Sequence, residues 1–162
     1  MKWLMFFSFL FTILLACTST KEKVYTTSSG ESVNKAKLLQ LVNEIRSKGC
    51  KCGDKWYPAV PTLKWNDVLE KVATRHSVDM AKNKSLSHNS SSGAGPGERI
   101  RNAGYRWTSY AENIAVGYTD EKTVIIGWLA SPGHCSNMMG RSYKEMGIGR
   151  SGNYWTQDFG SR

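Results

Sequence analysis

A chain of 162 residues has the length of one domain and is long enough to bury a self-supporting core. Its content of 40% apolar and 22% charged residues excludes general disorder. The formal net charge is +9, but Lys and Arg are spread along the chain and form no basic stripe with interleaved aromatic residues. The sequence therefore predicts no nucleic-acid partner.

The first residues differ in composition from the rest of the chain. Lys2 is followed by an apolar run that ends at Ala16 and is too short to span a bilayer comfortably. This pattern predicts a secretory signal peptide over residues 1–16. The LLAC segment at 14–17 resembles the bacterial lipoprotein signal, in which the cysteine is acylated, so we expect Cys17 to carry lipid. An ordinary signal peptide and an uncleaved anchor, with Cys17 incidental, are the alternatives.

The segment 17–33 is rich in Ser, Thr and charge and poor in large apolar residues, which predicts a flexible tether in front of a domain at 34–162. The expected location is the bacterial cell envelope, with the membrane bound through lipid on Cys17, or the extracellular space. Thr18 is not an aspartate, and by resemblance to lipoproteins this favours the outer membrane if the organism has one.

The first half of the domain predicts two long helices and a short one. Apolar residues at helical spacing predict a helix over 33–47, an irregular loop follows over 50–64, and Asn66 is the expected N-cap of a helix that ends near residue 82. His76 lies on the apolar face of this second helix, so we expect it to be buried and hydrogen-bonded to backbone. His88 opens a loop rich in Ser, Gly and Pro, and a short helix is expected over 98–103.

The second half predicts a mixture of strands and one further helix. The stretch 110–117 has β character with Glu112 at its start, a helix is expected over 120–130, and Pro132 ends it. Two short runs at 145–150 and 154–159, separated by Ser-Gly-Asn, predict a hairpin. Helices combined with a small sheet indicate an α+β domain.

A chain lipidated on its first cysteine has three others, and an exported compartment permits a disulfide between two of them. A bond between Cys50 and Cys52 would close a very tight loop, so we expect the bridge to run to Cys135. Cys52, which precedes a glycine, is the preferred partner, and Cys50 is the alternative. A zinc site made of Cys50, Cys52, Cys135 and His134 is a rival interpretation.

Five segments in order carry a resemblance to a known family: SLSH, AENIAVG, GWLASPGHCSNMM, KEMGIG and YWTQDFG. Together they resemble the CAP superfamily of cysteine-rich secretory proteins, antigen 5 and pathogenesis-related 1 proteins (also called SCP-like), in its bacterial form, over about residues 38–160. The resemblance implies a three-layer α-β-α sandwich with a small central antiparallel sheet. It also implies a surface cleft lined by histidines and acidic residues.

By this resemblance the family's cleft residues fall on three positions, namely His88, Glu112 and His134. A second glutamate is expected one turn after the tryptophan of the third long helix, but Ser131 stands there. The nearest acidic residues in sequence are Glu145 and Glu98. The incomplete set puts a metal function inherited from the family in doubt.

The chemistry of His88, Glu112 and His134 leaves three interpretations open. Two imidazoles and a carboxylate can hold a divalent metal such as zinc with open positions for water. Alternatively, Glu112 could orient a histidine that acts as a general base, or the three residues could form a rigid polar network without catalysis. Ser87 and Ser136 lie beside the histidines, but no G-x-S-x-G motif is present.

Two functions follow from these interpretations. One is a binding module for a lipid, a glycan or a partner protein. The other is a metal-assisted or histidine-based hydrolase of the cell envelope, so the sequence leaves open whether the protein is an enzyme. Trp107 and Tyr105, which lie near Glu112 in sequence, are the aromatic residues expected to be exposed for recognition.

Overall fold

The computed structural model describes Met1 and residues 30–162. The predicted signal peptide, the lipidation site at Cys17 and most of the predicted tether therefore lie outside the described residues. In the part that is described, no helix is long and apolar enough to cross a membrane.

Residues 30–162 form five helices and six strands in mixed order. The helices are α1 (Lys35–Lys48), α2 (Asp67–Asn83), α3 (Pro96–Asn102), α4 (Glu121–Ala130) and α5 (Pro132–Met138). The strands are β1 (Cys50–Cys52), β2 (Lys55–Tyr57), β3 (Lys64–Trp65), β4 (Ser109–Val116), β5 (Glu145–Ser151) and β6 (Tyr154–Ser161). The predicted helices and the predicted C-terminal hairpin are confirmed, with bounds that differ by a few residues.

Two sheets form within these residues. The larger sheet has the order β3-β5-β6-β4, so β4 is an edge strand. Strands β4, β5 and β6 pair antiparallel, whereas the two-residue strand β3 pairs parallel to β5, so the central sheet is mixed and not wholly antiparallel as expected. The small sheet is the β1–β2 hairpin, and the expectation of an irregular loop over 50–64 was wrong at this point.

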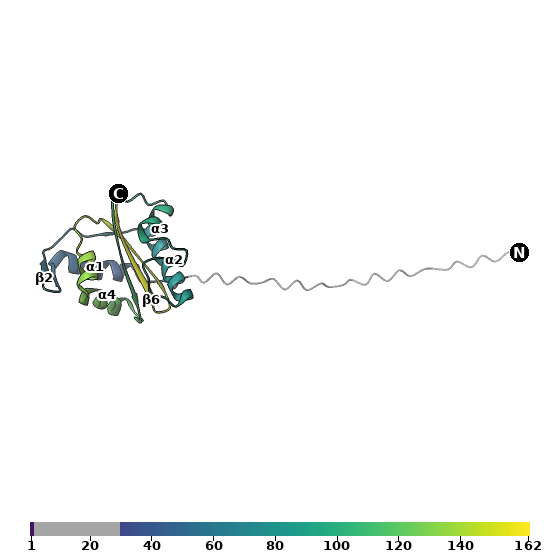
Figure 1. Ribbon diagram of the computed structural model, residues 1–162, viewed down its shortest axis with the longest axis horizontal. Helices are drawn as coiled ribbons and strands as arrows, with labels where there is room; N and C mark the ends of the chain where they lie inside the picture. Colours follow the sequence, from purple (N-terminus) through teal and green to yellow (C-terminus); the bar gives the residue numbers. More distant parts are fainter. Residues whose placement is uncertain (2–29) are drawn as a thin grey trace.

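Helices cover both faces of the larger sheet. On one face, a Cβ atom at Gly147 or Gly149 of β5 would come within 2.1 Å of backbone atoms of α2, so these glycines let α2 lie directly on the strand. On the other face, Met146 and Ile148 are fully buried in a core that includes side chains of α1 and α4. Helices α1 and α4 therefore lie on one side of the strands, and α2 and α3 lie on the other (Figure 1). The α+β sandwich with three layers is confirmed.

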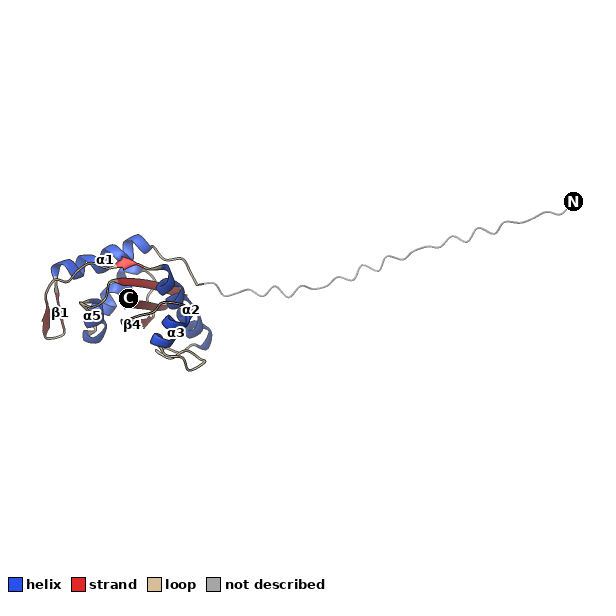
Figure 2. Cartoon of the chain, turned by 90° about the horizontal axis from the view of Figure 1, so that it is seen from above, coloured by secondary structure: helices blue, strands red, loops and turns tan. Residues whose placement is uncertain are grey.

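Helix boundaries follow the capping residues. The side chain of Asn66 accepts hydrogen bonds from the backbone N–H groups of Val68 and Leu69, as expected of the N-cap of α2. Helix α4 ends at Ala130, and Pro132 then occupies the first turn of α5, where its missing N–H costs nothing. The proline therefore starts a helix that the sequence did not predict. This short helix, seen beside β1 in Figure 2, carries His134 and Cys135.

Candidate functional site

Edge strand β4 presents adjacent polar residues to opposite faces of the sheet. Glu112 lies opposite Asp158 of β6, and Asn113 lies opposite Gln157. Because successive side chains of a strand point to opposite faces, Glu112 points to the side of α2 and α3, and Asn113 points to the side of α5. We call His88, Glu112 and His134 the edge site, because elements from both faces bring these residues to β4.

The carboxylate of Glu112 is held through both of its oxygens. Arg99 of α3 donates from Nη2 to Oε2 at 2.5 Å, and the Nδ1 of His88 lies 2.8 Å from Oε1. The Glu112 side chain is only 1% exposed, whereas the His88 side chain is 53% exposed. Nη1 of Arg99 also donates to the backbone oxygens of His88 and Ala94. These charge-assisted bonds fix the loop between α2 and α3 against β4.

A second carboxyl group lies beside Glu112. Asp158 is fully buried, and neither of its side-chain oxygens has a hydrogen-bond partner among the described residues. Burial, together with the neighbouring carboxylate of Glu112, raises the pKa of Asp158 well above its ordinary value. Arg99 provides one positive charge for two carboxyl groups, so Asp158 holds its proton to a higher pH than an exposed aspartate does.

His134 reaches the site from the opposite face, on α5. Its backbone oxygen accepts a hydrogen bond from Nδ2 of Asn113 at 3.1 Å, and Asn137 of the same helix donates to Oδ1 of Asn113 at 2.9 Å. Burial, and then the positive charge of His88, lower the pKa of His134 below the ordinary value for histidine. His134 is therefore a neutral imidazole at neutral pH, able to donate from one ring nitrogen and accept at the other.

The three edge-site residues do not gather into a compact metal centre in this structure. Among residues 30–162, the group of His, Cys, Asp or Glu side chains whose ligand atoms all lie within 4.8 Å of one another is Cys50, Cys52 and Cys135. Glu112 is also already bonded through both oxygens, so a metal would have to displace Arg99 or His88. The donor set as folded does not fit a zinc ion at this position.

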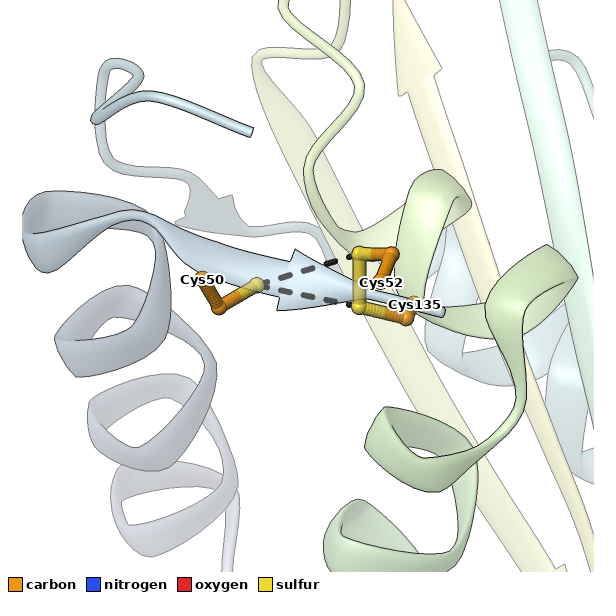
Figure 3. Close-up of side chains that lie close together, drawn as sticks. All are labelled: Cys50, Cys52 and Cys135. Atoms are coloured by element: carbon orange, nitrogen blue, oxygen red, sulfur yellow. Dashed lines mark hydrogen bonds between the residues drawn. A yellow bond between two sulfur atoms is a disulfide. The ribbon is translucent and has the colours of Figure 1, made fainter. Parts of the chain in front are cut away.

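The cysteine cluster is itself engaged in a covalent bond. Cys52 and Cys135 form a disulfide with an S–S distance of 1.96 Å, and Cys50 is a free thiol beside it (Figure 3). The structure thus contains the preferred pairing and not the Cys50 alternative. Because disulfide sulfurs are not thiolates, the rival zinc site with His134 lacks two of its four ligands.

Neither Glu145 nor Glu98 takes the place of the expected second glutamate. Ser131 lies between α4 and α5 and makes no side-chain capping bond. Glu145 is engaged elsewhere, since its two carboxylate oxygens accept hydrogen bonds from Asn66, Tyr105 and Arg162. Glu98 is an exposed residue in the first turn of α3. Neither acidic candidate joins the edge site.

Neither Ser87 nor Ser136 is activated as a nucleophile by a neighbouring histidine. The hydroxyl of Ser136 donates to the backbone oxygen of Gly133 at 2.7 Å, and the hydroxyl of Ser87 accepts from the backbone N–H of Asn89 at 3.1 Å. Both hydroxyl groups thus serve local backbone structure. Neither has a hydrogen bond to a histidine that could take its proton.

Three other predicted residues have clear positions. His76 is buried, with Nε2 2.8 Å from the backbone oxygen of Ser87, which is the structural role expected for it. Tyr105 is 1% exposed and bonds to Glu145, so its expected recognition role was wrong. Trp107 is partly exposed, and its ring lies 4.4 Å from the ring of Tyr110 on β4.

A hollow of about 270 Å³ is lined in part by Ser87 and Asn89, the residues that flank His88 in the sequence. Its walls come from the end of α2 and the following loop, and most of the lining side chains are polar: Asp79, Met80, Asn83, Ser85, Ser87, Asn89, Ser90 and Ser91. Oδ1 and Oδ2 of Asp79 hold the loop in place by accepting hydrogen bonds from Ser91. The surface beside the edge site is therefore rich in hydroxyl and amide groups.

Sequence reasoning missed the residues that connect the three predicted ones. Arg99, Asn113, Asn137 and Asp158 all contact or adjoin the edge site but were not singled out. A charged residue inside the apolar strand YWTQDFG was the available signal for Asp158, and the adjacent polar pair in AENIA was the signal for Asn113. The contact made by Arg99 depends on where α3 packs, and the sequence of α3 does not predict that position.

Comparison with known proteins finds a similar sequence and similar solved structures. The chain is 30% identical over 138 residues to the uncharacterized membrane protein YlbC of Bacillus subtilis (strain 168), covering 85% of this chain and 36% of that relative. An extracellular protein containing a SCP domain from Bacillus anthracis has a TM-score of 0.69 at 29% identity, with 78% of this chain and 40% of that chain covered. An outer surface protein from Borrelia burgdorferi has a TM-score of 0.65 at 22% identity, with 82% and 98% covered, and supports the fold alone.

The first two of these proteins are much longer than the matched region, since this chain spans 36% and 40% of their lengths. The sequence profile of the cysteine-rich secretory protein family (CAP) matches residues 39–159, which include β4, α5 and all three edge-site residues. On this match, the chain belongs to the CAP family.

Proposed function

We propose that this protein is a binding module of the bacterial cell envelope, anchored by lipid on Cys17, whose edge site and adjoining hollow bind a polar ligand of the carbohydrate class. The observation that carries the proposal is the state of Glu112. Both of its oxygens are engaged by Arg99 and His88, so the carboxylate stiffens the site and is not free to act as a base. The half-exposed His88 is left to face a ligand.

The chemistry next to His88 favours a polar ligand over a lipid. Seven of the eight residues that line the adjoining hollow carry a hydroxyl, amide or carboxylate group, and these groups match the hydroxyl groups of a glycan. The tilted pair of Trp107 and Tyr110 provides an aromatic face on the same side of β4 as Glu112.

The surface location is supported by the LLAC signal and by the similar protein from Bacillus anthracis, which is described as extracellular. At such a location the polysaccharides of the cell wall are the available carbohydrate. The probe for a test is therefore a mixture of soluble peptidoglycan fragments, with phospholipid vesicles as the competing ligand.

The test compares the affinity of the wild type for these fragments with that of two variants. We expect His88→Ala to weaken binding by about tenfold, equivalent to about 1.4 kcal/mol. Ile126→Ala, an exposed residue of α4 on the opposite face, is the matched control and should bind as the wild type does. Binding to vesicles with no binding to fragments would overturn the carbohydrate assignment.

A second candidate function, a histidine-based hydrolase, is favoured by one observation. The lowered pKa of His134 keeps its imidazole neutral at neutral pH, which is the form a general base needs. In the binding experiment the fragments should keep their masses after prolonged incubation. Hydrolysis would instead be supported if His88→Ala still shortened the fragments and His134→Ala did not.

A further inference from the structure

Three sulfur atoms lie in contact at the junction of β1 and α5, away from the edge site. The Sγ of Cys50 is 3.7 Å from the Sγ of Cys135 and 3.8 Å from the Sγ of Cys52, the two sulfurs of the disulfide. Figure 3 shows the Cys50 side chain pointing from β1 toward the bridge. Because Cys50 and Cys52 are two residues apart on one strand, both side chains point to the same face, toward α5.

Access differs sharply among the three sulfurs. Cys135 is fully buried and Cys52 is 4% exposed, so the bridge is closed to solvent. Cys50 is partly exposed and lines an apolar groove of about 270 Å³ between α1 and α4. A small thiol can therefore reach Cys50 through this groove but cannot reach the disulfide directly.

We propose that Cys50, Cys52 and Cys135 form a thiol–disulfide exchange site, in which Cys50 transfers the buried bridge to a position where a small thiol can reach it. The Cys50 thiol first gives its proton to solvent, and its sulfur attacks the Sγ of Cys135. A Cys50–Cys135 bond forms, the Cys52–Cys135 bond breaks, and the departing Cys52 thiolate takes up a proton. One disulfide and one thiol are present before and after, so the step needs no oxidant or reductant.

The Cys52–Cys135 and Cys50–Cys135 disulfides close chain loops of nearly equal length. The existing bridge joins residues 83 apart, and the exchanged bridge would join residues 85 apart. The stabilisation by loop closure depends on the logarithm of this length, so the two disulfides stabilise the fold by nearly the same amount. Attack on Cys52 would instead close the very short Cys50–Cys52 loop, so the exchange runs to Cys135.

The positions of the three sulfur atoms require the Cys50 side chain to move before exchange. The nearly equal distances place the Cys50 sulfur beside the disulfide and not on its extension, so the side chain must turn about its Cα–Cβ bond before an in-line attack. Once exchanged, the bridge includes the sulfur that faces the groove, where a small thiol such as glutathione can attack it. Release of the bridge would free α5, the helix that carries both Cys135 and His134.

Exchange should become faster at higher pH, because the attacking species is the thiolate. Burial raises the pKa of the Cys50 thiol above its ordinary value. Glu44 and Lys48 of α1 and Lys122 of α4 are the charged residues that line the same groove. Below the thiol pKa, each pH unit should raise the exchange rate by about tenfold.

The experiment uses the full chain with Cys17→Ser, compared with the same chain carrying Cys50→Ser as well. Each protein is incubated without and with reduced glutathione in the absence of oxygen, quenched in acid, alkylated and digested with trypsin. Lys51 lies between Cys50 and Cys52, so trypsin places these two cysteines on different peptides. Mass spectrometry then reports which cysteine was the free thiol.

Without glutathione, we expect alkylation on both Cys50 and Cys52 after incubation at alkaline pH. With glutathione, Cys50→Ser should slow reduction of the Cys52–Cys135 bridge by about tenfold or more. Near-ultraviolet circular dichroism checks that the variant keeps the native fold, and Cys50→Ala serves as a second variant. Alkylation confined to Cys50, with equal reduction rates in both proteins, would overturn the proposal.

Discussion

The buried carboxyl group of Asp158 makes the stability of the domain depend on pH in an unusual direction. In the unfolded chain this group loses its proton near a pH of about 3.9. In the folded protein, burial and the Glu112 carboxylate raise its pKa, so the folded state keeps the proton to higher pH. Its contribution to stability is therefore complete below the unfolded pKa and is lost as the pH rises toward the folded pKa.

The size of the effect follows from proton linkage. Over the range in which only the folded state holds this proton, the free energy of unfolding falls by about 1.4 kcal/mol per pH unit. Asp158→Asn keeps the size and the neutral polar character of the protonated side chain but does not titrate. The free energy of unfolding of Asp158→Asn, relative to that of the wild type, should therefore increase with pH by up to about 1.4 kcal/mol per pH unit.

Urea denaturation of both proteins between about pH 4 and pH 7 measures this difference. Asp120→Asn is the control. Asp120 caps α4, and hydrogen bonds from Thr123 and Lys122 lower its pKa. The contribution of its carboxylate to stability is therefore lost only as the pH falls through acid values. The difference between wild type and Asp120→Asn should be flat over this range. A difference that is equally flat for Asp158→Asn, or that shrinks as the pH rises, would refute the account of the pair.

Three further predictions test other parts of the structure. Glu112→Gln should lower the free energy of unfolding by about 3 kcal/mol, since it leaves the mostly buried Arg99 without its carboxylate, and chemical denaturation would detect this. Replacing Cys52 and Cys135 together by serine should lower it by about 4 to 5 kcal/mol, the loop entropy for a separation of 83 residues, while a wild-type denaturation midpoint would contradict this role. Cys17→Ser should abolish incorporation of radiolabelled fatty acid in a bacterial host, and unchanged labelling would disprove lipidation at this residue.

Much of the fold was predictable because local patterns decided it. The apolar spacing of the helices, the N-cap at Asn66 and the Ser-Gly-Asn turn all specify structure within a few residues, and each was found where expected. Helix α5 was missed because Pro132 ends one helix and starts the next, a dual role that the sequence pattern does not distinguish. The β1–β2 hairpin was missed because its strands are short and its flanks contain prolines.

The candidate site was only partly predictable, for a physical reason. His88, Glu112 and His134 could be chosen by resemblance, but their surroundings depend on strand register and helix packing. Asp158 meets Glu112 only because β4 and β6 pair in this register. Arg99 reaches the carboxylate only because α3 packs beside β4. These two residues change the interpretation of Glu112 from a free ligand or base to a fixed part of a network.

The most direct test of the proposed function is to locate the ligand by nuclear magnetic resonance. Isotope-labelled protein is titrated with soluble peptidoglycan fragments at neutral pH, and the backbone amide shifts are followed residue by residue. We predict that the shifts concentrate in residues 79–91 and around Glu112 and His134, with none along the groove between α1 and α4. Shifts confined to that groove, or no shifts at saturating fragment concentration, would contradict the assignment of the edge site as a carbohydrate-binding site.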